Sequence, residues 1–449
     1  MRTGGTKHER GVLLMHGALH SHEHFELHDI SKIEGHASLT VDLKGKKVES
    51  VKFRVSENNR FFEQMVLGKS YKELPLIVGR ICGFCSSAHL LAALEATENA
   101  FGVELGEQNH KLRELLLNGE FIKSHALHLF FLALPDYLGK QSVLEFDKKQ
   151  MKLIETALAL KKVGTEIVET VGGRSYHDLR LRVGGFFLLP NQKKLEHLYR
   201  DLLEAKKQAL EALELFAGYR EKFCFERKTN YIALAGKNYC LLCGTLASST
   251  GATIKEENYS LYFKEFVVPY STSTQVSFEG KEYMVGALAR INLNQGELCK
   301  SARDKIRELK LEFPSDSRYF NNIAQSIELL QCIESSIEIV NSFNLVKETP
   351  AQIVPRNTVG IGVIEAPRGT LYHQYKFDSN GFVKEANIIV PTSQNTHNIE
   401  RDIELLLPEL IEKKKHKHAI EHEFEKLIRA YDPCISCATH FLKVNWNQR

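Results

Sequence analysis

Two pairs of cysteines stand near opposite ends of this 449-residue chain. Cys82 and Cys85 lie in the segment RICGFCSSAH, and Cys434 and Cys437 lie in the segment DPCISCATH. Each pair has the spacing Cys-x-x-Cys and is followed closely by a histidine. Two such pairs offer four thiolates to one site, a soft ligand set that suits zinc, an iron–sulfur cluster or thiolate-bound nickel.

A structural zinc site is the main alternative that the spacing leaves open. Zinc ribbons usually separate their cysteine pairs by about 15–20 residues, whereas most of this chain lies between the two pairs. In the first pair, Gly83 can adopt a positive φ, which would let the loop turn both sulfurs inward. Cys85 precedes a helix predicted to start near Ser86, and a helix N-terminus favours the thiolate form.

The remaining five cysteines lack such a setting. The total of nine is odd, and in a reducing compartment close pairs indicate metal or redox chemistry rather than disulfides. Cys240 and Cys243 form a third Cys-x-x-Cys, in the apolar stretch YCLLCG. No histidine or second pair accompanies them, so we interpret them as small buried hydrophobes. Cys224, Cys299 and Cys332 are isolated and are expected to be core or surface thiols.

Helical periodicity predicts most of the scaffold that must position these residues. The clearest apolar stripe, at steps of three and four, consists of Leu195, Leu198, Leu202, Ala205, Ala209, Ala212 and Phe216. Helices are predicted over 87–101, 108–133, 193–217, 297–311, 318–344, 397–412 and 417–430. Strands are predicted within 37–55, 228–292 and 357–391. The fold class expected from this pattern is mainly α with small β appendages (α+β).

Composition excludes several classes of protein. Hydrophobic residues make up 43% and charged residues 26% of the chain, as in ordinary globular proteins, and the formal net charge is +3. We therefore expect no nucleic-acid partner. No apolar run approaches the roughly 18 residues needed to span a bilayer, so we expect no direct membrane insertion and a cytoplasmic location. Residues 1–28 hold six histidines and are expected to be flexible.

Together, the two cysteine motifs resemble the signature motifs of nickel–iron hydrogenase large subunits. The resemblance extends along the chain through IEGHASL at 33–39, NRFFEQMVLGK at 59–69, KSHALHLFFLALPDY at 123–137, KEFVVP at 264–269, YMVGALARI at 283–291, EAPRG at 365–369 and IIVPT at 388–392. These segments look most like the alpha subunit of soluble cytosolic NADP-linked hydrogenases, also called sulfhydrogenases. The resemblance implies the large-subunit fold, with a central bundle of long helices and one catalytic domain over 1–440.

The resemblance also implies the cofactor and its ligands. Cys82, Cys85, Cys434 and Cys437 are expected to bind nickel, and Cys85 and Cys437 to bridge it to an iron that carries carbon monoxide and cyanide. Cys82 and Cys434 are then terminal ligands of nickel. Splitting H2 needs a Lewis acid for the hydride and a base for the proton. Cys434 is expected to take the proton, and Glu34 matches the family's proton-relay glutamate.

Further residues are assigned to the surroundings of the centre by the same resemblance. Arg368 matches an arginine poised over the metal pair, where a guanidinium can donate hydrogen bonds without losing its charge. Thr392 matches a hydroxyl that donates to cyanide, and Asp432 and His89 are expected to orient and protect the site. Ser124 departs from the aspartate that many respiratory members carry, which weakens any mechanism that pairs a carboxylate there with the arginine.

A further metal ion, magnesium or a third metal such as iron, is expected on Glu63, His440 and the backbone carbonyl of Ile388. A maturation endopeptidase is expected to remove 441–449, so that the mature chain ends at His440. Without the four metal-binding cysteines the chain has no plausible iron–sulfur ligand set. The resemblance therefore implies an iron–sulfur small subunit, further flavin or iron–sulfur subunits, and NADP as the expected final acceptor of electrons from H2. No G-x-G-x-x-G follows a predicted strand, so NADP is not expected to bind this chain.

Two alternatives to a hydrogenase remain open from the sequence. One is a metal-free structural subunit of a related electron-transfer complex, such as the subunit of respiratory complex I that has lost the metal. The other is a zinc-bound structural or interaction protein. Retention of all four cysteines argues against the metal-free alternative.

Overall fold

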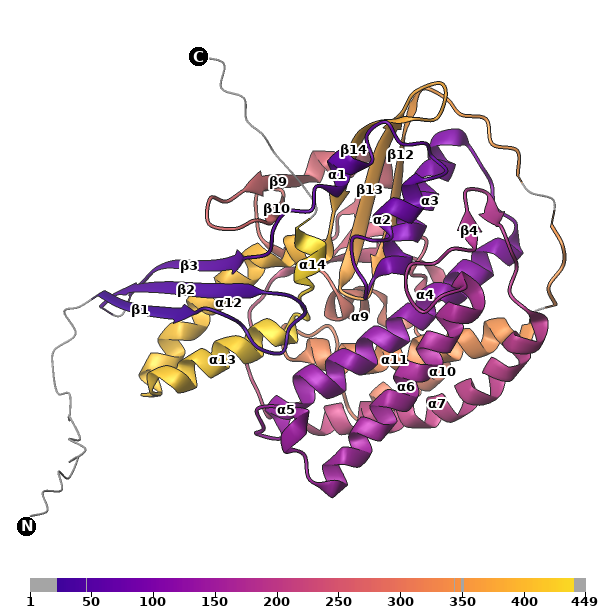
Figure 1. Ribbon diagram of the computed structural model, residues 1–449. Coiled ribbons are helices and arrows are strands. Elements are labelled where there is room, and N and C mark those ends of the chain that lie inside the picture. The colour runs from indigo at the N-terminus through magenta and orange to yellow at the C-terminus, as the bar shows by residue number, and fades with distance from the viewer. Residues whose placement is uncertain (1–21, 46, 343, 349–350, 440–449) are drawn as a thin grey trace, which may run out of the picture.

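Four long helices form a bundle in the computed structural model, which describes residues 22–45, 47–342, 344–348 and 351–439. They are α4 (Glu107–Leu127), α6 (Lys148–Gly172), α7 (Gln192–Gly218) and α11 (Phe320–Ser342). Figure 1 shows them side by side below the main sheet. The end of α4 continues through a π-helical turn, His128–Ala133, into the short α5 (Leu134–Tyr137). This bundle and the small sheets around it confirm the expected fold class.

The bundle is held by apolar stripes and by one close helix crossing. The apolar stripe predicted on α7 is buried along its whole length. Helices α4 and α6 cross at two glycines: a Cβ on Gly119 would lie 2.9 Å from the carbonyl oxygen of Gly164, and a Cβ on Gly164 would lie 2.6 Å from that of Gly119. Contacts this short require glycine at both positions. The crossing fixes the middle of α4, from which side chains reach the cysteine site.

The main sheet is antiparallel and consists of β12 (Thr358–Ala366), β13 (Gly369–Phe377) and β14 (Val383–Ile389). Ala366 pairs with Gly369, so the hairpin between β12 and β13 closes through Pro367 and Arg368 alone. Helix α3 (Ser86–Phe101) lies across β12, where Gly360 and Gly362 admit its backbone; a Cβ on Gly362 would lie 2.4 Å from the oxygen of Ala92. The sheet thus brings Arg368 close to the start of α3.

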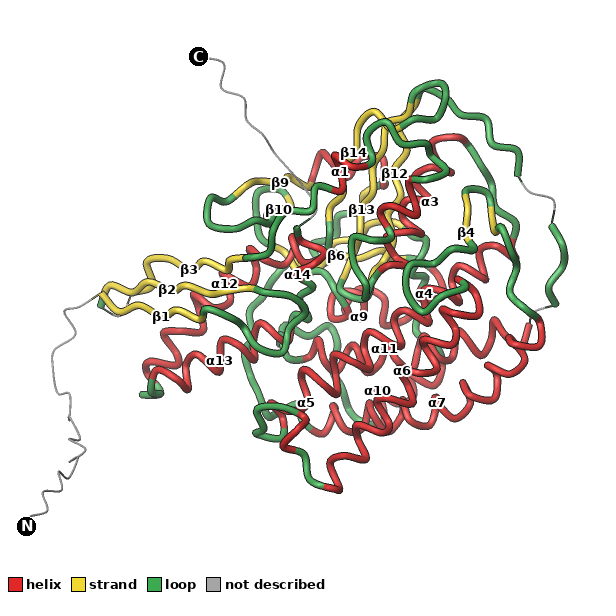
Figure 2. Tube along the Cα trace, viewed as in Figure 1, coloured by secondary structure: helices red, strands yellow, loops and turns green. Residues whose placement is uncertain are grey.

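A second antiparallel sheet, β1 (His22–Leu27), β2 (Ala37–Lys44) and β3 (Lys47–Val55), extends from one side of the molecule. It lies beside α12 (Pro391–Glu412) and α13 (Lys417–Ala430), as the colours of Figure 1 and the yellow strands of Figure 2 show. The expectation that 1–28 is flexible is wrong for His22–Leu27, because Phe25 and Leu27 bury their side chains in the core. Residues 1–21 lie outside the described residues.

The remaining β structure consists of short strands. Its strands are β4 (Leu181–Arg182), β5 (Gly185–Phe186), β6 (Asn230–Ala235), β7 (Thr245–Ser248), β8 (Thr253–Ile254), β9 (Phe263–Val267), β10 (Thr274–Phe278) and β11 (Tyr283–Met284). The shorter helices are α1 (Phe62–Met65), α2 (Leu74–Val78), α8 (Tyr259–Tyr262), α9 (Ala287–Asn294), α10 (Lys300–Glu308) and α14 (Ile435–Ala438). No helix among the described residues is both long and apolar enough to cross a bilayer.

The fold brings the two ends of the described chain together. Glu34 forms an isolated parallel bridge with Cys434, and the backbone N–H of Ile435 donates to the carbonyl of Glu34 at 3.0 Å. One hydrophobic cluster runs from Phe25 to Ala438 and includes all four cysteines of the two terminal motifs. The cysteine pairs therefore lie inside the core, between α3 and the C-terminal α14.

Candidate metal centre

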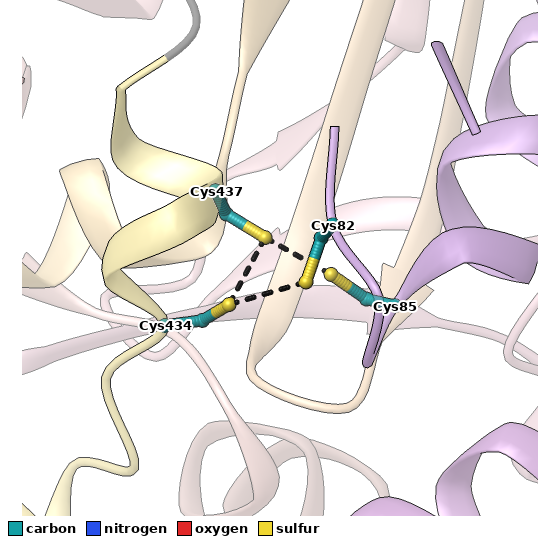
Figure 3. A group of neighbouring side chains, drawn as sticks. All are labelled: Cys82, Cys85, Cys434 and Cys437. Carbon is teal, nitrogen blue, oxygen red and sulfur yellow. Dashed lines mark hydrogen bonds between the residues drawn. The ribbon is translucent and has the colours of Figure 1, made fainter. Parts of the chain in front are cut away.

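The four cysteine sulfurs of the terminal motifs meet at one point. Their Sγ atoms all lie within 4.8 Å of one another, and each side chain is at least 96% buried. Three pairs of sulfurs are in contact, as the dashed lines of Figure 3 mark: Cys82 and Cys434 lie 3.3 Å apart, Cys85 and Cys437 3.0 Å, and Cys434 and Cys437 3.2 Å. A zinc–thiolate bond is about 2.3 Å long, so four sulfurs this close together could share one metal ion. Among the described residues, this is the one such group of histidine, cysteine and carboxylate side chains.

Each cysteine pair sits on a tight turn at the start of a helix. Cys85 is the residue before α3, and Cys434 is the residue before α14. Gly83 does not adopt the positive φ that we expected. The loop instead turns through a hydrogen bond from the backbone N–H of Phe84 to the sulfur of Cys82, at 3.3 Å.

A carboxylate that sequence reasoning missed fixes the first turn of α3. Cys85 supplies no side-chain cap to this helix. Glu120 of α4, fully buried, accepts hydrogen bonds from the backbone N–H groups of Ser87 at 2.7 Å and Ala88 at 3.0 Å. A carboxylate at a helix N-terminus satisfies orphan donors and opposes the positive end of the helix dipole. Glu120 therefore anchors the turn that carries Cys85, and only the tertiary contact reveals this role.

Glu34 lies against the second cysteine pair, where the resemblance places a proton relay. Its Oε2 is 3.2 Å from the sulfur of Cys434 and accepts the backbone N–H of Ser436 at 2.9 Å. Its other oxygen accepts the hydroxyl of Ser436. Glu34 itself is half-buried. The carboxylate thus stands between a buried thiol and the exterior, held in place by three donors.

Arg368, at the hairpin tip, lies near the sulfurs. Its guanidinium is 2.9 Å from a carboxylate oxygen of Asp432 and also donates from Nε to the backbone carbonyl of Asp432 at 2.9 Å. Burial acts to lower the pKa of Arg368, but Asp432 and the nearby thiolates outweigh it and hold the pKa well above its ordinary value. A second nitrogen lies 3.5 Å from the hydroxyl of Ser124. The arginine therefore keeps its charge within the core.

Asp432 is itself held in an uncommon conformation. It has a φ of 52°, which costs a non-glycine residue of this kind of order 1 kcal/mol or more. The side-chain amide of Gln325 donates to its second oxygen at 2.9 Å, and His128 lies 3.9 Å away. Gln325 and His128 were not predicted from the sequence. They have no motif of their own and are recognisable only because α11 and the end of α4 converge on Asp432.

A series of three aromatic side chains in contact with one another starts at the sulfur of Cys437. His89 Nε2 lies 3.8 Å from the sulfur of Cys437, and His89 Nδ1 lies 3.0 Å from Nε2 of His373. The hydroxyl of Tyr375 lies 2.6 Å from Nδ1 of His373. All three rings are buried. His373 and Tyr375 alternate on β13, a position that sequence reasoning assigned only to a strand.

Thr392 supports the second cysteine pair from the start of α12. Its hydroxyl oxygen accepts the backbone N–H of Cys434 at 2.9 Å. This hydrogen bond leaves the hydroxyl proton able to point into the site. Thr392 therefore holds the backbone of Cys434 in position.

The predicted third metal site is only partly within the described residues. Glu63 of α1 and Ile388 of β14 lie together, but the carboxylate accepts the backbone N–H of Ile388 at 2.8 Å. The predicted ligand is the carbonyl of the same residue. His440, the third predicted ligand, lies outside the described residues.

The pKa values of the four thiols indicate a site that binds a metal rather than four free thiols. Burial, followed by the neighbouring cysteines, raises the pKa of the Cys434 thiol well above its usual range, and burial raises the pKa of the Cys437 thiol to about 11. Hydrogen bonds from the other sulfurs, led by Cys434, lower the pKa of Cys82 alone. Four thiolates cannot share this volume without positive charge. A divalent cation supplies that charge and displaces the remaining protons.

The third cysteine pair is not what we expected. Cys240 and Cys243 are joined by a disulfide, Cys240 is half-buried and Cys243 is exposed. The interpretation as small buried hydrophobes is therefore wrong, because the pair lies on a surface loop before β7. Cys224 is exposed, Cys299 is partly buried and Cys332 is buried, as core or surface thiols should be.

Comparison with known proteins gives one consistent result. The family model described as nickel-dependent hydrogenase matches residues 60–187 and 253–440. The chain is 34% identical to the alpha subunit of sulfhydrogenase 1 of Pyrococcus furiosus, over 92% of this chain and 97% of that protein. It is 33% identical to a subunit of the vhu F420-non-reducing hydrogenase of Methanocaldococcus jannaschii, over 84% of this chain and 96% of that protein.

A solved structure shares the fold over most of the chain. The crystal structure of an NAD+-reducing [NiFe]-hydrogenase in the H2-reduced state superposes with a TM-score of 0.82 and 27% identity, covering 93% of this chain and 99% of that one. The residues that the family model matches include both cysteine motifs. The chain belongs to the nickel-dependent hydrogenase family, as a large subunit.

Proposed function

We propose that this protein is the catalytic subunit in which H2 is split heterolytically at a nickel–iron centre held by Cys82, Cys85, Cys434 and Cys437. The observation that carries the proposal is the meeting of four buried sulfurs with a carboxylate, Glu34, 3.2 Å from one of them. The bound metals supply Lewis acidity and redox chemistry, and carbon monoxide and cyanide on the iron belong to the same proposal.

The residues of the chain then handle the proton. The sulfur of Cys434 takes a proton in the reaction, and Glu34 Oε2 is within hydrogen-bond reach to receive it. Because Glu34 is half-buried, its carboxylate connects the buried thiol to the exterior. Ser436 holds the carboxylate with two donors, so the distance to the sulfur does not depend on a mobile side chain.

Arg368 supplies a fixed positive charge beside the sulfurs. A guanidinium paired with Asp432 cannot lose its proton, so it donates hydrogen bonds to a ligand such as cyanide without competing for the proton from H2. Its partner is Asp432 rather than residue 124, because Ser124 offers a hydroxyl where many respiratory members carry aspartate. Thr392 and His89 complete the surroundings, each in contact with one of the cysteines.

Electrons must leave through another protein chain. The sulfhydrogenase and F420-non-reducing hydrogenase relatives are, by their names, subunits of larger enzymes. We propose an iron–sulfur small subunit next to the four cysteines, further flavin or iron–sulfur subunits, and NADP as the final acceptor. A cytoplasmic location is part of the same proposal.

Maturation and the further metal ion are proposals of the same kind. Glu63 and Ile388 meet beside β14, and His440 follows α14 closely in the chain. We propose that an endopeptidase cuts after His440, and that His440, Glu63 and the carbonyl of Ile388 bind magnesium or iron. Intact-mass measurement of active enzyme tests the cut, since the mature chain should lack Trp446.

The Glu34→Gln variant tests the proton route. In enzyme purified with its partner subunits, H2-dependent reduction of a dye should fall by about 10²–10⁴-fold, the contribution typical of a positioned acid–base group. Nickel and iron contents should be unchanged, because Glu34 is not a proposed ligand. Glu57→Gln is the matched control, since Glu57 accepts the backbone N–H of His36 at 3.2 Å.

The control should keep activity within about twofold of the wild type, as expected of a substitution outside the proton route. Activity of Glu34→Gln within the same range, at full metal content, would contradict the proposed route. Zinc alone in the wild-type enzyme would support the zinc-bound alternative, and no metal would support a structural role.

A further inference from the structure

The Cys240–Cys243 disulfide lies outside the metal centre, on the loop between a 3₁₀ turn, Lys237–Tyr239, and β7. Cys243 is exposed and Cys240 is half-buried. The exposed sulfur is open to attack, and the half-buried one is the natural leaving group of an exchange reaction. Access to one sulfur of a Cys-x-x-Cys pair is a general condition for thiol–disulfide exchange.

Both cysteines line a cavity of about 540 Å³. Its other walls come from α3, from the first turns of α4 and from β12; the polar residues among them are Glu95, Glu98, Asn99, Glu104, His110, Arg113 and Glu114. A volume of this size accommodates a small molecule. The disulfide therefore opens into a defined space rather than onto a flat surface.

The outer edge of β12 holds a carboxyl group beside the disulfide loop. The backbone N–H of Glu365 donates to the carbonyl of Leu241 at 2.8 Å, and that of Val363 lies close enough to the carboxyl of Glu95 to act on its pKa. Two residues apart on one strand, these donors lie roughly 6.6 Å from each other and point the same way. The fold thus places Glu95 next to the loop between the two cysteines.

The carboxyl of Glu95 is suited to carry a proton. Its Oε2 is buried and has no hydrogen-bond partner among the described residues. Burial, followed by the charges of Glu256 and Glu98, raises the pKa of Glu95 well above its usual range. A raised pKa favours the neutral form of the carboxyl group, which has a proton to give.

The cavity carries an excess of negative charge. Among its described lining residues Arg113 is the one lysine or arginine, and it is committed to Glu98 through contacts of 2.6 and 2.7 Å. Glu104, at the exposed rim, and Glu114 have no such partner in the lining. The charge disfavours anionic molecules and favours cationic ones.

We propose that Cys240 and Cys243 form a thiol–disulfide exchange site for small neutral or cationic thiols, with Glu95 as the proton donor. A thiolate attacks Sγ of Cys243 and the bond between the two cysteines breaks. The Cys240 thiolate that leaves takes a proton from Glu95. A second small thiol then attacks the sulfur of the thiol bound to Cys243. This releases a disulfide of the two small thiols and leaves Cys243 as a free thiol. Two thiols are oxidised to one disulfide, the protein disulfide is reduced to a dithiol, and Glu95 recovers its proton from the incoming thiols.

Charge selection in the purified hydrogenase, with its partner subunits, tests the site. The enzyme is treated anaerobically with cysteamine, a cationic thiol, or 3-mercaptopropionate, an anionic one. Reduction of the 240–243 pair is followed by alkylation and peptide mass spectrometry. The reduction rates of the same disulfide in urea-denatured enzyme give the intrinsic ratio of the cysteamine rate to the 3-mercaptopropionate rate. In the folded enzyme the ratio should shift towards cysteamine by about tenfold or more, and Glu104→Gln should reduce that shift.

Two further variants separate exchange from structure. Cys240→Ser, treated with cystamine, should gain one cysteamine adduct on Cys243, faster than on Cys224, the exposed single cysteine that serves as the internal control. Glu95→Gln should slow reduction by cysteamine, and Glu95→Asp should restore part of the rate at equal nickel content. The proposal is overturned if the ratio of the two reduction rates is the same in folded and denatured enzyme. It is also overturned if both cysteines of enzyme isolated without reductant are alkylated immediately, because no disulfide then joins them. Loss of H2 turnover has no bearing on this readout.

Discussion

Replacement of Glu120 by glutamine tests how the first cysteine pair is held. Glu120 accepts the N–H groups of Ser87 and Ala88 at the start of α3, two and three residues after Cys85. Glutamine keeps the size but offers one acceptor, so one buried N–H loses its partner. We expect a loss of about 1–3 kcal/mol of stability at pH 5, the cost of one unsatisfied buried donor.

The same variant should change the dependence of stability on pH. Burial raises the pKa of Glu120 to about 7 from an ordinary value of 4.5, against the opposing effects of Lys123 and the backbone of Ser87. The folded protein therefore holds this proton between pH 4.5 and 7 while the unfolded chain does not. Stability of the wild type falls as pH rises through that window, by about 3 kcal/mol at 1.36 kcal/mol for each pKa unit. Glutamine does not titrate, so the variant escapes this loss.

Urea unfolding of this chain purified by itself, at pH 5, 6.5 and 8 and followed by circular dichroism, measures both effects. The difference between wild type and Glu120→Gln should shrink or reverse as pH rises. Asp147→Asn, which removes an exposed carboxylate far from the cysteines and keeps an oxygen that can cap α6, serves as the control substitution. A pH-independent difference would refute the assignment of a buried, protonated carboxyl at position 120.

Two other changes probe the buried charges around the site. Arg368→Lys should lower H2 turnover about 10–100-fold at unchanged metal content, because lysine cannot keep both contacts with Asp432; full activity would contradict that role. Glu328→Gln should destabilise the fold by about 3–5 kcal/mol in urea unfolding, because it leaves Arg290 without its main buried partner. Burial opposes ionisation of Glu328, but Arg290 outweighs it and holds the pKa at about 2, so this contribution is present above pH 4.5 and is lost as pH falls towards 2. Equal acid sensitivity of wild type and variant would contradict it.

Periodicity in the sequence predicted several of the helices that bury an apolar stripe. The range predicted for α13 agrees with the structure, and α7 buries the predicted stripe. Helix α6 was not predicted, although it buries a stripe at steps of three and four that consists of Ile154, Ala157, Leu160, Gly164, Ile167 and Val171. Helix α12 begins at Pro391 instead of 397, because its first turns bury polar side chains that hydrogen-bond to neighbouring strands, as Gln394 does with Thr370.

The site was predictable to the extent that it carries local motifs. The spacing of the cysteines indicated a metal site, and the family resemblance supplied Glu34, Arg368 and Thr392. Residues that act through tertiary contact, such as Glu120 and His373, have no signature of their own. The disulfide at Cys240 was missed for a related reason, because an apolar sequence context says nothing about where a loop meets the surface.

Joint metal analysis and infrared spectroscopy of the purified enzyme test the central claim most directly. We predict one nickel together with iron for each copy of this chain, and bands from bound carbon monoxide and cyanide. Substitution of Cys437 by alanine should abolish both signals, because this sulfur lies 3.0 Å from Cys85 and 3.2 Å from Cys434. Zinc alone, or nickel that survives the loss of Cys437 with unchanged bands, would contradict a shared four-sulfur centre.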